Sequence, residues 1–129
     1  MVKKYLLDTN IFLEILLLQA KQNDCKKFIE NHFDEIALSQ FSLNSIGVSC
    51  YRNKSVDVFT SFLRDIASSV PVFTLNVSQL LLMEAIISNY NLDYDDSYQF
   101  VVAQTNNLEI LILDSDFKKV EDLLKIHFL

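Results

Sequence analysis

The chain has 129 residues, of which 50% are hydrophobic, and it carries a formal net charge of −6 at pH 7. A chain of this length and hydrophobicity can bury a substantial core, so we expect a single domain over residues 1–129. The acidic balance excludes a protein that binds nucleic acid mainly through its own positive field. Any chemistry on nucleic acid would then need metal ions, a local basic patch or a partner.

Glycine and proline each occur only once. This scarcity of turn formers favours many helices with short connections over a turn-rich sandwich or barrel. No apolar run approaches the roughly 20 residues of a membrane span, so we expect no membrane segment. The apolar segment near the start is interrupted by Asp8, Asn10 and Glu14, which is not the pattern of a signal peptide.

The two cysteines, Cys25 and Cys50, lie far apart and lack the Cys/His spacing of a zinc site. We therefore expect reduced thiols in the core and a cytoplasmic protein. His32 lies in a charged helical segment and His127 in the tail, and we expect structural or solvent-exposed roles for both.

Apolar segments alternate with segments of helical periodicity along the chain. Strands are expected at residues 5–7, 35–39, 70–75, 109–114 and 126–129. Helices are expected at 11–18 with Asn10 as the cap, 24–33, from Ser42 to near Tyr51, 55–68, 78–90, 94–105 and 117–124. Pro71 favours an edge or strand-start position, and the four apolar residues 110–113 are typical of a strand covered on both faces. The alternation predicts an α/β fold, with a parallel sheet of four to five strands flanked by helices.

Acidic residues stand where such a sheet would expose them. Asp8 follows the first expected strand, Asp114 and Asp116 follow the strongest later one, and Asp96 lies at the start of a helix. Because the carboxyl ends of parallel strands share one edge, we expect these side chains to converge. Converging carboxylates repel each other unless protons or cations intervene, and Mg²⁺ or Mn²⁺ is the usual cation at such sites.

Simpler interpretations exist for each acidic group alone. Asp93 or Asp95 is a good helix cap, and residues 114–116 fit a turn. Asp8 is harder to explain in this way, because a charge directly after a buried strand is costly. The metal hypothesis therefore depends on the set of carboxylates.

Three motifs occur in order: Leu-Leu-Asp-Thr-Asn-Ile at 6–11, Asp-Asp-Ser-Tyr-Gln at 95–99 and Leu-Asp-Ser-Asp-Phe at 113–117. Their order and spacing resemble the PIN-domain family, small metal-dependent ribonucleases that include VapC-like toxins. The resemblance covers essentially the whole chain. It implies a three-layer domain that hydrolyses RNA phosphodiester bonds with Mg²⁺ or Mn²⁺ and metal-activated water.

By position, the resemblance assigns metal binding to four aspartates. Asp8 matches the first of them, Asp96 the one that begins the long helix, and Asp114 and Asp116 the acidic pair after the fourth strand. Thr9 and Asn10 would support this rim through hydrogen bonds.

One position departs from the family pattern. The family usually carries a glutamate on the helix after the second strand, where this chain has Ser45, with Asn44 beside it. Neither side chain is charged, and we expect Glu14 to face solvent rather than replace the glutamate. Metal binding and cleavage would then be weakened or absent. The alternative function is a PIN-like module that binds RNA or protein without cleaving.

Few residues are available to contact an anionic substrate. Arg52 and Lys54 follow the helix that lacks the glutamate, and we expect them to contact RNA. The resemblance also implies a homodimer and a small antitoxin that inserts a basic side chain into the acidic pocket. A receiver-like signalling domain fits less well, because Asn76 follows the strand at 70–75 and no lysine is placed after the last strand.

Overall fold

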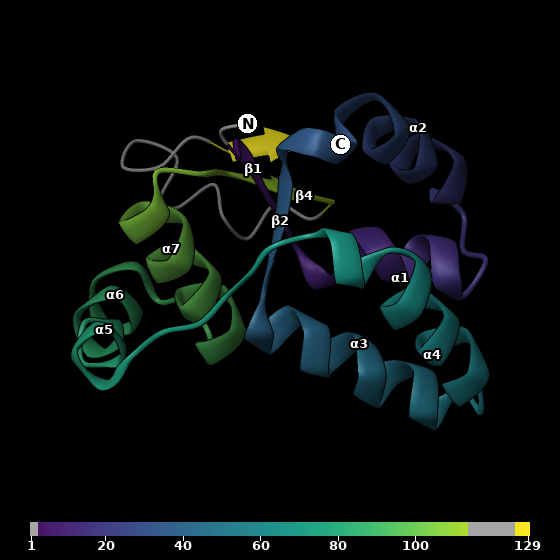
Figure 1. Ribbon diagram of the computed structural model, residues 1–129. Coiled ribbons are helices and arrows are strands. Elements are labelled where there is room, and N and C mark those ends of the chain that lie inside the picture. The colour runs from purple at the N-terminus through teal and green to yellow at the C-terminus, as the bar shows by residue number, and fades with distance from the viewer. Residues whose placement is uncertain (1–2, 114–125) are drawn as a thin grey trace.

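The computed structural model describes residues 3–113 and 126–129, and its strands and helices alternate along the chain (Figure 1). The strands are β1 (Tyr5–Leu7), β2 (Ile36–Ser39), β3 (Val72–Phe73), β4 (Glu109–Ile112) and β5 (Ile126–Phe128). The α-helices are α1 (Thr9–Leu16), α2 (Gln22–His32), α3 (Gln40–Arg52), α4 (Val56–Asp65), α5 (Val77–Leu80), α6 (Met83–Tyr90) and α7 (Tyr94–Asn106). None of the helices in these ranges is both long and apolar enough to cross a membrane.

The five strands form one sheet in the order β3-β2-β1-β4-β5, and every pair is parallel. Tyr5 of β1 pairs with Ile36 on one side and Glu109 on the other, so the three central strands begin level with each other. Their carboxyl ends therefore meet at one edge of the sheet. The parallel α/β prediction is confirmed, and Pro71 precedes an edge strand as expected.

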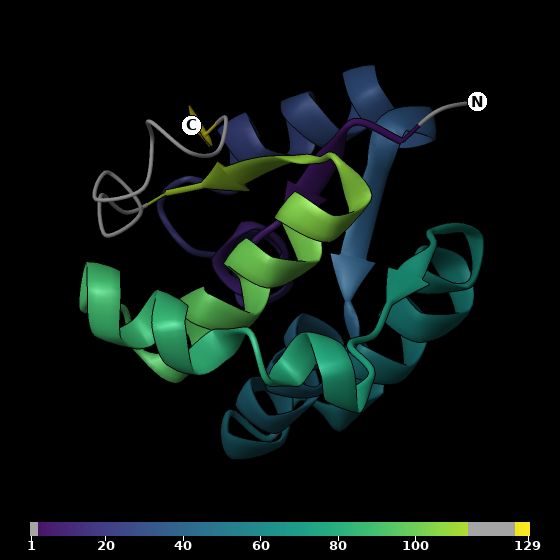
Figure 2. The ribbon, with the colours of Figure 1, turned by 90° about the vertical axis from the view of Figure 1, so that its left-hand side faces the viewer.

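Alternating side chains on the sheet create two apolar cores. Tyr5 and Leu7 of β1 join one core with residues of α1, α2, α3 and α4, whereas Leu6 joins the other with residues of α6 and α7. The views agree: α1 to α4 lie on one side of the sheet, and α7 lies across the other side (Figures 1 and 2). The domain thus has three layers, and its central strands are buried on both faces.

Helices α1, α2, α3 and α5 begin one or two residues earlier than the sequence suggested, and at α1 and α3 the predicted start was the wrong residue. The Asn10 cap was wrong, because α1 already starts at Thr9 and Asp8 is its N-cap, with extended backbone angles. The start at Ser42 was also wrong. The Ser39 side chain accepts a hydrogen bond from the Ser42 N–H at 3.0 Å and caps α3 from the last residue of β2. In both places the strand passes into the helix without a loop.

The predicted segments after α3 are shorter in the structure. The helix expected at 55–68 ends at Asp65 and is followed by a 3₁₀ turn, Ala67–Ser69. The strand expected at 70–75 pairs only over Val72–Phe73 and lies at the edge of the sheet. The helix expected at 78–90 is divided into α5 and α6 at a turn where the Leu82 N–H bonds to the carbonyl of Gln79, three residues back. The helix predicted at 117–124 lies outside the described residues.

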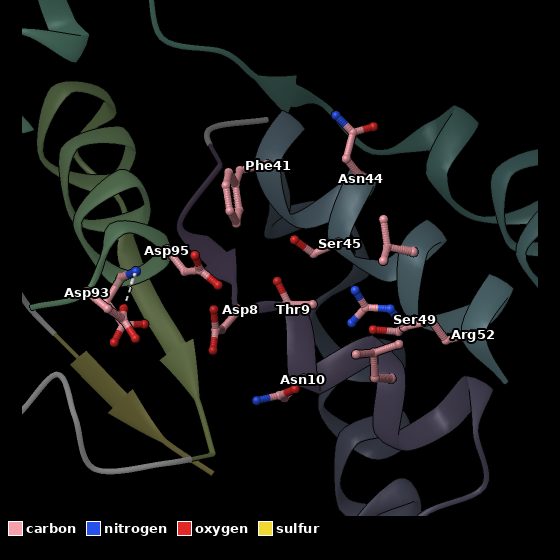
Figure 3. Close-up of a pocket in the computed structure, with 13 residues that line it drawn as sticks. Asp8, Thr9, Asn10, Phe41, Asn44, Ser45, Ser49, Arg52, Asp93 and Asp95 are labelled. Atoms are coloured by element: carbon pink, nitrogen blue, oxygen red, sulfur yellow. Dashed lines mark hydrogen bonds between the residues drawn. The ribbon is translucent and has the colours of Figure 1, made fainter.

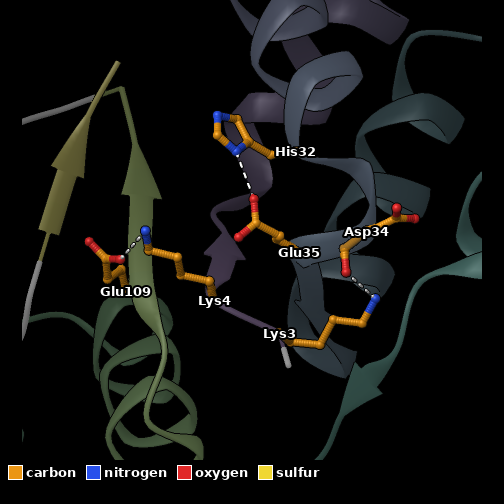
Figure 4. Close-up of polar contacts among 6 residues, drawn as sticks. All are labelled: Lys3, Lys4, His32, Asp34, Glu35 and Glu109. Atoms are coloured by element: carbon orange, nitrogen blue, oxygen red, sulfur yellow. Dashed lines mark hydrogen bonds and ion pairs between the residues drawn. The ribbon is translucent and has the colours of Figure 1, made fainter. Parts of the chain in front are cut away.

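Polar contacts gather at the amino-terminal ends of the strands (Figure 4). The Lys3 ammonium donates to the backbone carbonyl of Asp34 at 2.8 Å, and Lys4 lies 3.8 Å from a Glu109 carboxylate oxygen. His32 Nδ1 lies 3.0 Å from Glu35 Oε1, in a partly exposed pair. These contacts lie at the amino-terminal edge of the sheet, opposite the carboxyl edge where Asp8 lies.

Both cysteines are fully buried and free, as predicted. Burial, with smaller contributions from the carboxylates of Glu14 and Asp24, raises the pKa of the Cys25 thiol to about 11. Burial also raises the pKa of Cys50.

The raised pKa of Cys25 predicts a loss of stability in alkaline solution. The folded state favours the neutral thiol, so its contribution is complete below pH about 8.5 and is lost as the pH approaches 11, by at most about 3 kcal/mol. Denaturant unfolding between pH 8 and 11 should show a steeper decline for the wild type than for Cys25→Ala. Parallel pH profiles for the two proteins would contradict this prediction.

Candidate active site

The site is built at the carboxyl ends of the central strands. Asp8 directly follows β1, and its backbone N–H donates to the carbonyl of Leu111 in β4 at 3.0 Å. Although Asp8 is the N-cap of α1, its side chain makes no capping hydrogen bond. The backbone is therefore held at the sheet edge, while the carboxylate, not engaged as a cap, lines a cavity there.

Helix α7 brings a second group of carboxylates to the same edge. The Asp93 side chain accepts a hydrogen bond from the Asp96 N–H at 3.2 Å, so the capping role of Asp93 is confirmed (Figure 3). Asp95 and Asp96 occupy the first turn of α7. Negative side chains are favourable there, because the N-terminus of a helix carries partial positive charge.

Helix α3 forms the opposite wall. Ser45, Ser49 and Arg52 are spaced four and three residues apart, so they lie on one face of the helix. Figure 3 shows Asp8, Asp93 and Asp95 gathered on one side, whereas Arg52 enters from the end of α3 on the other. Ser45 lies on this wall as a neutral hydroxyl.

These elements enclose a cavity of about 560 Å³. It is lined by Asp8, Thr9, Asn10, Leu13, Phe41, Asn44, Ser45, Val48, Ser49, Arg52, Asp93, Asp95 and Asp96. Seven residues singled out from the sequence are thus brought together: Asp8, Thr9, Asn10, Asn44, Ser45, Arg52 and Asp96.

Three other predicted site residues lie elsewhere or cannot be placed. Lys54 lines a neighbouring cavity of about 510 Å³, together with Tyr51, Arg52, Val56 and Asp57. Arg52 therefore borders both cavities. Asp114 and Asp116 lie outside the described residues.

Two buried polar residues behind the cavity escaped the sequence analysis. Gln99 Nε2 lies 2.8 Å from Ser42 Oγ and 3.3 Å from Asp8 Oδ1, and Ser42 Oγ lies 3.0 Å from Thr9 Oγ1. Gln99 belongs to a motif quoted above, but only its aspartates carried a signal for function. The contacts join positions 57 and 91 residues apart, which local periodicity does not reveal.

The donor set of the cavity fits a hard divalent cation. Four carboxylates and one guanidinium line it, and its other polar groups are hydroxyls and side-chain amides. Oxygen ligands of this kind suit Mg²⁺ or Mn²⁺ and not a soft metal. Within residues 3–113 and 126–129, no three acidic, histidine or cysteine side chains are arranged to hold an ion.

Solved structures with the same fold include toxin–antitoxin proteins. VapBC2 from Rickettsia felis, bound to a DNA fragment from its promoter, aligns with a TM-score of 0.77 and 16% identity over 100% of this chain and 99% of that one. A toxin–antitoxin complex from Klebsiella pneumoniae gives 0.73 and 17% over 96% of each chain. FitAcB from Neisseria gonorrhoeae gives 0.71 and 17%, covering 97% of this chain and 96% of that one.

Among curated proteins, none matches this chain at a significant level. The family model of the PIN domain matches residues 5–123, from the first strand to beyond the last of the three motifs. This match spans nearly the whole chain and agrees with the parallel sheet and the position of Asp8 at its carboxyl edge. The chain therefore belongs to the PIN-domain family.

Proposed function

We propose that this protein is a metal-dependent endoribonuclease and the toxin of a toxin–antitoxin pair. The observation that carries the proposal is the convergence of Asp8 and Asp96 with Thr9 and Ser45 on one acidic cavity at the carboxyl edge of a PIN-domain sheet. Toxin–antitoxin complexes of the same fold support the second half of the proposal.

In this proposal Asp8, Asp96, Asp114 and Asp116 hold Mg²⁺ or Mn²⁺. When bound, the ion supplies an activated water and neutralises charge that develops on the phosphate. Thr9 and Asn10 orient groups at the rim through hydrogen bonds, and Asn44 and Ser45 offer neutral oxygens from the opposite wall. Asp114 and Asp116 are included in this ligand set because of the family resemblance alone.

Arg52 and Lys54 would contact the RNA backbone. Neither forms an ion pair within the part of the chain that the structure describes, and both side chains are exposed. Arg52 borders both cavities, so a single strand could pass from the acidic cavity to Lys54. Tyr51 is 73% exposed in the second cavity and offers a ring on which a base can stack.

The proposal also includes partners. An acidic cavity lined by four aspartates is complementary to a basic side chain, which is what a small antitoxin would insert. Exposed apolar side chains are available for association with a second copy of the chain. They include Tyr51, Val77, Leu81 and Tyr94.

Calorimetry with Mn²⁺ and cleavage of a varied single-stranded RNA pool test this function. We expect binding at millimolar or lower Mn²⁺ and metal-dependent cuts. The double variant Arg52→Gln/Lys54→Gln should bind the RNA more weakly. The slope of log K against log[salt] should become less steep by about one to two. If the wild type binds no Mn²⁺ at millimolar concentration, the enzyme proposal fails.

A second candidate is a PIN-like module that binds RNA or protein without cleaving it. The observation that favours it is Ser45, a neutral residue on the cavity wall where the family usually has a glutamate. Mn²⁺ binding and RNA retention without cleavage would support this candidate over the enzyme.

A further inference from the structure

A single amide is buried in the apolar face of α7. Gln99 is 1% exposed, and its neighbours Phe100 to Ala103 are completely buried. Its amide reaches behind the acidic cavity, to Ser42 in α3 and Asp8 after β1. Three elements of the site therefore meet at this side chain.

Geometry shows which way the amide faces. The Gln99 nitrogen lies 3.3 Å from Asp8 Oδ1, so its N–H donates and the carboxyl oxygen accepts. The same nitrogen donates its second proton to Ser42 Oγ at 2.8 Å. Both protons of the Gln99 amide are thereby used within the site.

This orientation also determines the direction of the next hydrogen bond. Ser42 is fully buried, so its hydroxyl proton needs an acceptor, and among the described residues Thr9 Oγ1 at 3.0 Å provides one. Thr9 is only partly buried and lines the cavity. Its own proton is then left to point into the cavity, where a phosphate oxygen or a water can accept it.

The arrangement has a cost. Gln99 Oε1 is buried, and no hydrogen-bond partner for it exists within the described residues. A buried carbonyl without a partner destabilises a fold by about 1–3 kcal/mol, and an apolar side chain of the same size avoids that penalty. The cost of the carbonyl is offset by the two hydrogen bonds that the nitrogen of the same amide donates to the site.

We propose that Gln99 is a positioning residue of the candidate active site. Its amide holds the Asp8 carboxylate toward the cavity and, through Ser42, directs the Thr9 hydroxyl as a donor to a bound oxyanion or water. The inference rests on the proposed function, because a metal-bound phosphate is the ligand that both groups would serve.

Gln99→Met tests the proposal, because methionine fills a similar volume without an amide. We expect the Tm to stay within a few degrees of the wild type or to rise, since the unpaired carbonyl is removed. Mn²⁺ affinity measured by calorimetry should fall about tenfold, the range seen when groups that orient metal ligands are lost. Gln104→Met, an exposed glutamine on the same helix, should change neither value.

Two substitutions at Thr9, which is less buried than Gln99, test the proposal even if Gln99→Met does not fold. Thr9→Ser retains the hydroxyl and should keep cleavage of the RNA pool, whereas Thr9→Val removes it and should lower kcat more than it raises KM. Wild-type Mn²⁺ affinity in a folded Gln99→Met variant would overturn the proposal. Equal activity of the two Thr9 variants would also overturn it.

Nuclear magnetic resonance separates this inference from the proposed function. In the metal-free wild type, the two side-chain amide protons of Gln99 should exchange slowly, and Ser42→Ala should release one of them. If the wild type binds no Mn²⁺ but shows this signature, the enzyme proposal fails while the positioning of Asp8 stands. Rapid exchange of both protons in the wild type would reject the positioning role whatever the metal result.

Discussion

Asp8→Asn is expected to lower Mn²⁺ affinity and RNA cleavage by at least about 100-fold. Loss of a group that merely orients a metal ligand costs about 10–100-fold, so loss of the charge on a direct ligand should cost no less. The variant should remain folded for two reasons. The Asp8 side chain makes no capping hydrogen bond, and the Asn carbonyl can still accept from Gln99.

The control for this experiment is Asp34→Asn. Asp34 is an exposed acid near the opposite edge of the sheet, and it accepts the Lys3 ammonium through its backbone carbonyl, which the substitution preserves. The control has the same charge change and should match the wild type in affinity and cleavage. An Asp8→Asn protein that binds Mn²⁺ and cuts RNA like this control would remove Asp8 from the metal site.

Ser45→Glu is expected to tighten Mn²⁺ binding by about tenfold and to raise cleavage, because it adds a carboxylate to the cavity that Asp8 and Asp96 line. Charge and number of ligands are the main determinants of affinity for hard cations. The side chain of residue 45 lines a cavity of about 560 Å³, so three additional heavy atoms can enter without displacing the core. Calorimetry and the RNA pool measure both effects.

Ser49→Glu provides a matched control on the same helix. Ser49 also lines the cavity, one turn further along α3 and nearer to Arg52 (Figure 3). A glutamate there adds the same charge but lies closer to the guanidinium than to Asp8, so it should leave Mn²⁺ affinity almost unchanged. If both variants tighten binding equally, the gain reflects net charge and not a ligand at position 45.

Much of the architecture could be predicted from local pattern. Strand β1 was placed at its observed bounds, because its apolar run is directly followed by helical periodicity. The parallel order followed from the alternation of strands and helices, and Pro71 marked an edge strand. Element ends were less predictable, because a strand runs directly into a helix at two places. Ser39 is both the last residue of β2 and the N-cap of α3, and Asp8, the N-cap of α1, directly follows β1.

Part of the candidate site could also be foreseen. The convergence of Asp8 with Asp96 follows from the rule that carboxyl ends of parallel strands share an edge. Lys54 was grouped with Arg52 because they are neighbours in sequence. In the structure Lys54 occupies a left-handed turn after α3, with φ of 55°, and lines the second cavity only.

The fold class and the meeting of Asp8 with Asp96 could be predicted without coordinates, because strand and helix periods and charged residues are local properties of a sequence. Only the tertiary structure revealed that Gln99 joins Asp8, Ser42 and Thr9 behind that edge. A glutamine in an apolar helix has no local signature of function. Its role depends on which distant groups the packing of α7 against β1 and α3 brings within hydrogen-bonding distance.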